Sequence, residues 1–115
     1  DGYIKDRIRV GISFYEISEE SAKINNSKAG LLVKEIDASC DIAKTDIQVN
    51  DTITKINGKS VYMRADVDEV MKGKKPGDEV SATVYRKDET GREKTFEIKF
   101  KLMKDTSTEI DTSNN

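Results

Sequence analysis

VNDTITKINGKSV, residues 49–61, is the stretch that decides the fold. Its middle part, DTITKI at residues 51–56, is rich in β-branched side chains and follows a period of two, which is typical of a strand. Asn57-Gly58 comes directly after it, and this dipeptide is a common signal of a tight turn between strands. The stretch therefore predicts a strand that ends in a turn.

The same pattern recurs on both sides of this stretch. Four further strands are predicted, at residues 10–16, 31–36, 79–86 and 93–103. The last two are joined by KDETGR, in which Gly91 is free to adopt a positive φ. These two strands are therefore predicted to form a hairpin within a larger sheet.

Helical signals are fewer. Residues 64–72 (RADVDEVMK) place apolar side chains at i, i+3 and i+4, put Asp66 where the helix dipole favours an anion, and stop before a glycine. Shorter helices are predicted at residues 18–24, where Ser18 is the candidate N-cap, and at residues 39–44. The predicted fold is α+β: a small β-rich domain with a curved antiparallel sheet or partial barrel, capped by two helices.

The chain is predicted to hold one folded unit. Its 115 residues suffice for a domain with short tails. Residues 1–7 are interpreted as a linker from an upstream domain, residues 8–103 as the domain, and residues 104–115 as a disordered tail rich in Ser, Thr, Asn and Asp. Because the sequence begins at Asp1 without a signal peptide, we expect it to be a piece of a longer protein.

Composition argues against catalysis and against metal binding. Histidine is absent, which removes Ser-His-Asp triads, Cys-His dyads and HExxH zinc sites. Cys40 is the single cysteine and is interpreted as a small half-buried thiol. The carboxylates lack the spacing of calcium ligands. We therefore expect no catalytic residue, no metal and no cofactor.

The charge pattern argues against nucleic acid as a partner. Lys and Arg total 20 and Asp and Glu total 22, so the net charge is −2 with the two signs interspersed. Nucleic-acid binders are usually basic. The sequence also has no apolar run that approaches the roughly 18 residues of a transmembrane helix.

Four segments in a fixed order resemble the PDZ domain in its bacterial form. They are AGLLVKEI at 29–36, the short helix at 39–44, the stretch at 49–61 quoted above, and KPGDEV at 75–80. The lead-in GYIK and the segment RVGI at 9–12 resemble the linker and first loop of PDZ domains that follow the trypsin-like serine protease domain in the HtrA/Deg family. The resemblance covers residues 2–103.

Three positions depart from the family pattern. Asn50 stands where the family usually has glycine, and because Asn tolerates the left-handed conformation, the turn should be kept. Ala38 replaces a common proline. Arg9 stands where the first loop usually carries an aromatic or aliphatic residue, and this difference bears on the ligand preference.

The resemblance implies a site that works by β-augmentation, in which an extended peptide pairs with the edge of a strand. That strand would run from Ile12 to Glu16. The loop before it would aim backbone N–H groups at the terminal carboxylate of the peptide, where a Cβ on Gly11 would obstruct the approach. The helix at 64–72 would form the other wall, with Val67 and Val70 turned to the core. The implied peptide-binding residues are Arg7, Arg9, Val10, Gly11, Ile12, Ser13, Phe14, Arg64, Asp68 and Met71.

The resemblance further implies a non-catalytic module that captures C-terminal or extended unfolded segments and recruits substrate to, or regulates, an HtrA/Deg-like serine protease. Its partners would be such peptides and an upstream protease domain, with an oligomer formed through the parent protein. The family places the parent in the cell envelope or elsewhere outside the cytoplasm. Two alternatives stay open: a PDZ-like domain of a processing peptidase or membrane metalloprotease, and a structural assembly domain whose groove is closed.

Overall fold

The computed structural model of the chain describes residues 8–104, and of Arg9 and Lys104 it describes the backbone. The predicted linker at residues 1–7 and residues 105–115 of the predicted tail lie outside the described residues. Lys104, which the sequence analysis assigned to the tail, is the last residue of a strand. No helix within residues 8–104 is long and apolar enough to cross a membrane.

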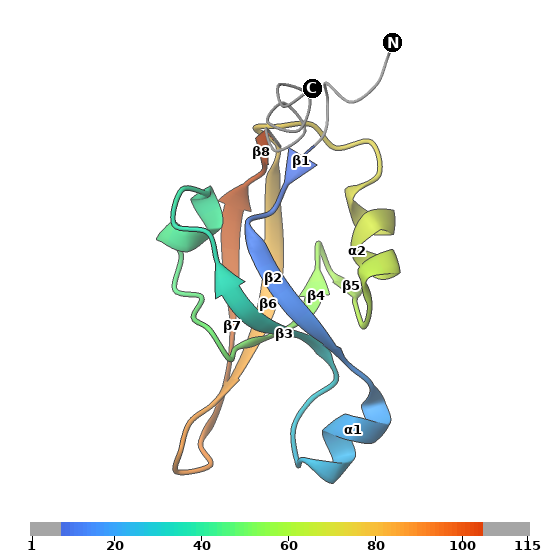
Figure 1. Cartoon of the computed structure of the whole chain (residues 1–115), viewed down its shortest axis with the longest axis vertical. Coiled ribbons are helices and arrows are strands. Elements are labelled where there is room, and N and C mark those ends of the chain that lie inside the picture. Colours follow the sequence, from blue (N-terminus) through green and yellow to red (C-terminus); the bar gives the residue numbers. More distant parts are fainter. Residues whose placement is uncertain (1–7, 105–115) are drawn as a thin grey trace, which may run out of the picture.

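A six-stranded antiparallel sheet forms the body of the domain (Figure 1). β5 pairs with β4 off the main path, and β1 pairs with β8 in a separate two-stranded ribbon. Together with two α-helices, this architecture confirms the predicted α+β fold. The main path follows β2 (Ile12–Ile17), β3 (Gly30–Ile36), β4 (Thr52–Ile56), β6 (Glu79–Lys87) and β7 (Glu93–Lys101), and the short strands are β1 (Ile8–Arg9), β5 (Lys59–Ser60) and β8 (Met103–Lys104).

The turns form at the residues that the sequence analysis predicted for them. Asn57 and Gly58 have φ values of 51° and 81°, which is the pair of positive values that a type I′ turn requires. Asn50 takes the left-handed conformation with φ 80°, as expected of the residue that replaces the family's glycine. Gly91 has φ 87° in the loop between β6 and β7. Short-range turn chemistry therefore fixes the turn before β4, the turn after β4 and the loop between β6 and β7.

Two predicted strands differ from the structure by two residues at one end, and the others by a single residue. The strand predicted at 10–16 begins at Ile12, because Gly11 adopts φ 102°, outside the strand region. The strand predicted at 93–103 is divided at Leu102. The Leu102 N–H donates to the Asp78 carbonyl at 2.9 Å, and the Leu102 carbonyl accepts from the Gly77 N–H at 2.8 Å. Leu102 thus pairs with the loop before β6, and the chain continues as β8.

The helices lie where the sequence predicted them. α1 (Glu19–Ile24) begins after Ser18, whose hydroxyl accepts from the Ser21 N–H at 3.2 Å. α2 (Arg64–Met71) extends beside the sheet in Figure 1, and the Asp66 carboxylate accepts from the Tyr62 N–H at 2.8 Å, just before its first turn. The short helix predicted at 39–44 is a 3₁₀ turn, η2 (Asp41–Lys44).

One hydrophobic core joins the sheet, η2 and α2. Met71 is the buried residue of α2, and the half-buried Val67 and Val70 pack against the same cluster. Cys40 is 3% exposed, so the thiol predicted to be half-buried is a core side chain. The most deeply buried large side chains are Leu31, Val33, Ile42, Ile53, Val61, Val80, Val84, Phe100 and Leu102.

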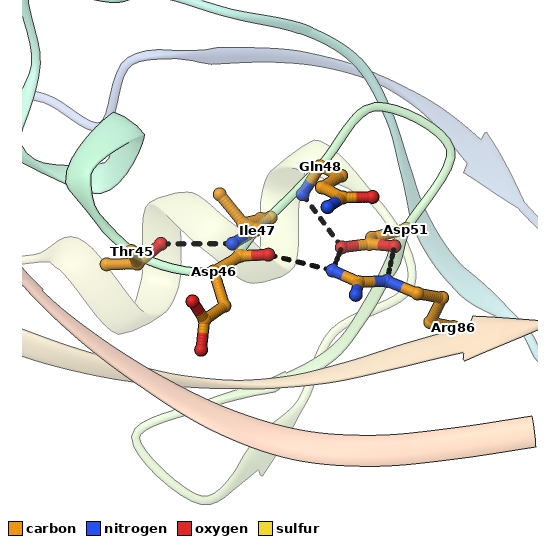
Figure 2. A network of polar contacts seen from close by, with 6 residues as sticks. All are labelled: Thr45, Asp46, Ile47, Gln48, Asp51 and Arg86. Atoms are coloured by element: carbon orange, nitrogen blue, oxygen red, sulfur yellow. Dashed lines mark hydrogen bonds and ion pairs between the residues drawn. The ribbon is translucent and has the colours of Figure 1, made fainter.

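A partly buried ion pair ties the turn before β4 to β6 (Figure 2). Asp51 is 2% exposed, and its carboxylate accepts from Nε and Nη2 of Arg86, each at 2.8 Å, and from the Gln48 N–H at 2.8 Å. Nη2 of Arg86 also donates to the Asp46 carbonyl at 2.7 Å. The bond to Asp51 raises the pKa of the Arg86 guanidinium. The network fixes the loop that leads into the central strand.

Candidate functional site

A groove of about 770 Å³ lies between β2 and α2, a size typical of ligand pockets. β2 is an edge strand of the main path, paired with β3 on one side. The walls of the groove include Val10, Gly11, Ile12, Ser13 and Phe14 from the β2 side, Arg64, Val67, Asp68 and Met71 from α2, and Lys34, Glu35 and Ile36 from β3.

The two walls run in opposite directions. The guanidinium carbon of Arg64, at the start of α2, lies 5.9 Å from the centre of the Phe14 ring. The Arg64 N–H donates to Oε2 of Glu16, further along β2, at 2.7 Å. The start of α2 therefore faces the end of β2, and Met71 lies toward the Val10–Gly11 end. An extended ligand would run along the groove from one of these ends to the other.

The Val10–Gly11 end is shaped by tight packing beneath the chain. A Cβ added to Gly11 would lie 2.4 Å from Cβ and 2.8 Å from Sγ of Cys40, and the residue has φ 102°. The Gly11 carbonyl accepts from the Asp37 N–H at 2.7 Å, which fixes the loop to the end of β3. The backbone conformation and the thiol behind the loop thus require glycine here. The sequence analysis gave a different reason, the approach of the peptide carboxylate.

The helix wall presents two turns of α2 to the groove. Arg64 and Asp68 line it from exposed positions one turn apart, and Met71 lines it as a buried side chain with 8% exposure. Val67, which the sequence analysis assigned to the core, is half-buried and lines the groove as well. Val70 packs against the core.

Of the residues predicted for the site, eight lie along the groove and two cannot be placed. Arg7 lies outside the described residues, and of Arg9 the backbone alone is described, in β1. The sequence analysis missed the three groove residues of β3, which are Lys34, Glu35 and Ile36. The position of Lys34 depends on a register shift in which Ser13 pairs with Glu35 but Phe14 pairs with Val33. Lys34 is the extra residue of this bulge, and no short-range signal in the sequence marks it.

The titratable groups with the clearest pKa shifts lie elsewhere. Burial and a hydrogen bond from the hydroxyl to Glu93 raise the pKa of Tyr85 to about 12. Hydrogen bonds from the Thr90 hydroxyl and the Arg92 N–H lower the pKa of Asp88. Neither residue lines the groove. No group of three His, Cys, Asp or Glu side chains suited to a metal ion occurs within the described range.

This fold, with a groove between an edge strand and a helix, is that of a PDZ domain. Residues 9–100 match the sequence model of the PDZ domain, so the chain belongs to that family. The chain is 30% identical over 95 residues to the serine protease Do-like HtrB of Bacillus subtilis (strain 168), a match that covers 74% of this chain and 21% of HtrB. The chain thus spans about a fifth of the length of this relative.

Two solved structures share the fold. The HtrA-type protease AlgW, solved with a decapeptide, aligns with a TM-score of 0.66 and 17% identity over 87% of this chain and 30% of AlgW. The HtrA3 PDZ domain, bound to a phage-derived ligand (FGRWV), aligns with a TM-score of 0.57 and 17% identity over 82% of this chain and 89% of that chain. The resemblance to PDZ domains of HtrA-type proteases is thereby confirmed.

Proposed function

We propose that the chain is a non-catalytic module that binds the C-terminal end of an extended peptide in the groove. The observation that carries this proposal is the groove itself, between the edge strand β2 and α2, with the Gly11 loop at one end. A peptide strand added to β2 would gain backbone hydrogen bonds largely independent of its sequence. The terminal carboxylate would lie at the Gly11 loop, and the last side chain between Ile12 and Met71.

The two similar structures support this proposal, since AlgW was solved with a decapeptide and the HtrA3 PDZ domain with the phage-derived ligand FGRWV. We expect weak binding, with Kd of about 1 to 100 μM, because ordering a flexible peptide offsets much of the gain from pairing and burial. A peptide offered as a free acid and as a C-terminal amide tests the proposal, and the free acid should bind more tightly.

The proposed parent is an HtrA-type serine protease, to which the module would recruit substrates or whose activity it would regulate. The similarity to HtrB favours this parent over a processing peptidase or a membrane metalloprotease. The open groove favours ligand binding over a structural domain with a closed groove. From the resemblance to this family we further propose that the parent acts in the cell envelope or elsewhere outside the cytoplasm, with any oligomer formed through its other parts.

Asp68 should set a charge preference for the ligand. It lines the groove from the middle of α2, one turn before Met71. We expect the third side chain from the end of a bound peptide to lie beside it. A carboxylate there should favour Lys over Glu by about 0.2 to 1 kcal/mol, since the pair is exposed to water. Asp68→Lys should invert this preference when peptides with Lys or Glu at that position are titrated.

The matched control is Glu69→Lys, which makes the same charge change at the neighbouring exposed residue of α2, outside the groove lining. It should leave the sign of the preference unchanged. If Asp68→Lys also leaves it unchanged, Asp68 does not contact the ligand. The preference should fade as salt rises to about 0.5 M.

A further inference from the structure

The start of α2 is held to β2 by a side chain that does not line the groove. Glu16 lies two residues beyond Phe14 on β2, and its Oε2 accepts from the Arg64 N–H at 2.7 Å. The N-cap residue of α2, Met63, makes no side-chain capping bond. Glu16 therefore satisfies a helix N–H that local capping leaves open, across 48 positions of sequence.

The two ends of α2 are anchored differently. Met71 is buried in the core at the C-terminal end, and Val67 and Val70 pack against it. Between the fully buried Val61 and the half-buried Val67, Arg64 and Ala65 are exposed, so apolar burial does not hold the first two residues of α2 themselves. The carboxylate of Glu16 joins the first turn to β2 through a charge-assisted hydrogen bond, which is stronger than a neutral one.

We propose that Glu16 is a positioning residue that sets the width of the groove at its far end, and thereby its selectivity for the third residue from the ligand's C-terminus. This inference rests on the proposed function. Successive side chains on one face of a strand lie about 7 Å apart, so a ligand whose last side chain lies by Met71 places the third-last near Phe14, at the level between Asp68 and Arg64 on α2. Losing Glu16 should widen this end and leave the Met71 end in place.

The test is a set of titrations of the 115-residue chain and its Glu16→Ala variant with two pairs of free-acid peptides. One pair differs at the third-last residue, with Ala or Trp, and the other differs at the last residue, with Val or Ala. Glu16→Ala should shift the Ala-to-Trp affinity ratio toward Trp on the order of tenfold, because a wider groove admits the larger side chain. The Val-to-Ala ratio at the last residue should stay within about twofold.

Two control variants test whether the change in selectivity comes from the hydrogen bond of Glu16, rather than from its charge or from a general loss of stability. Glu16→Gln keeps an oxygen acceptor for the Arg64 N–H and should retain most of the selectivity of the original chain. Glu97→Ala removes an exposed carboxylate from the middle of β7, away from the groove, and should change neither ratio. Equal changes of both ratios in Glu16→Ala, or no change in either, would overturn the proposal.

A measurement without ligand separates this inference from the proposed function. Amide hydrogen exchange at Arg64 should accelerate on the order of tenfold in Glu16→Ala, while exchange at Met71 stays the same. Unchanged exchange at Arg64 would contradict the role of Glu16 even if peptides bind. Failure of every peptide to bind the original chain would instead refute the proposed function, and the role of Glu16 in selectivity with it.

Discussion

Replacing Arg86 with methionine is expected to lower the free energy of unfolding by about 3 kcal/mol, at the lower end of the range for breaking a buried ion pair. The Arg86 side chain is 25% exposed, so water weakens the pair, but Asp51 is 2% exposed and would keep an uncompensated charge. The substitution also removes the contact of the guanidinium with the Phe96 ring, 4.8 Å from its centre. Urea denaturation with a constant m-value measures the loss.

Two comparisons make this test specific. Arg92→Met removes an exposed arginine from the loop between β6 and β7 and should change stability by less than about 0.5 kcal/mol. Adding Asp51→Asn to Arg86→Met should recover part of the loss, because the buried charge disappears with its partner. If Arg86→Met costs no more than Arg92→Met, the network in Figure 2 does not stabilise the domain.

Gly11→Ala is expected to reduce both stability and binding. A left-handed conformation costs a residue with a Cβ roughly 1 to 2 kcal/mol, and overlap with Cys40 at 2.4 Å adds about 1 to 3 kcal/mol. Relief of the overlap must move the loop, so a C-terminal peptide should bind at least about tenfold more weakly, through loss of charge-assisted hydrogen bonds. Denaturation and peptide titration measure the two effects.

Gly91→Ala is the matched control for this change. Gly91 has φ 87°, but a Cβ there would meet no atom within 4 Å, so the substitution adds strain without overlap. It should lower the free energy of unfolding only by the cost of the left-handed conformation, and it should leave peptide affinity unchanged. Cys40→Gly in the Gly11→Ala background should recover part of the stability. Equal effects of Gly11→Ala and Gly91→Ala would show that the packing of Cys40 against the loop is unimportant.

The parts of the fold that could be predicted depend on signals close in sequence. Asn57-Gly58 specifies its turn through two positive φ values, and the apolar spacing of α2 specifies its buried face. The ribbon of β1 and β8 could not be predicted, because two-residue strands have no periodicity and Ile8 pairs with Lys104 across the whole domain. The division at Leu102 likewise depends on hydrogen bonds to the loop before β6.

The groove, like the fold, could be predicted only in part from the sequence. Its two walls could be predicted from the order of segments that resembles a PDZ domain, which assigned Asp68 and Met71 to the helix wall. Three features depend on contacts between distant segments: Lys34 in a bulge, Cys40 beneath Gly11, and Glu16 at the start of α2. Sequence patterns report which face of an element is apolar, but they do not report which neighbour that face will meet.

Binding of a peptide in the groove by its C-terminal end is tested by calorimetric titration with one peptide made as a free acid and as an amide. We expect the free acid to bind about tenfold or more tightly, because loss of the terminal charge removes charge-assisted bonds at the Gly11 loop. Gly91→Ala should keep this difference and Gly11→Ala should abolish it. Equal affinity of the free acid and the amide for the original chain would show that the Gly11 loop does not bind a terminal carboxylate.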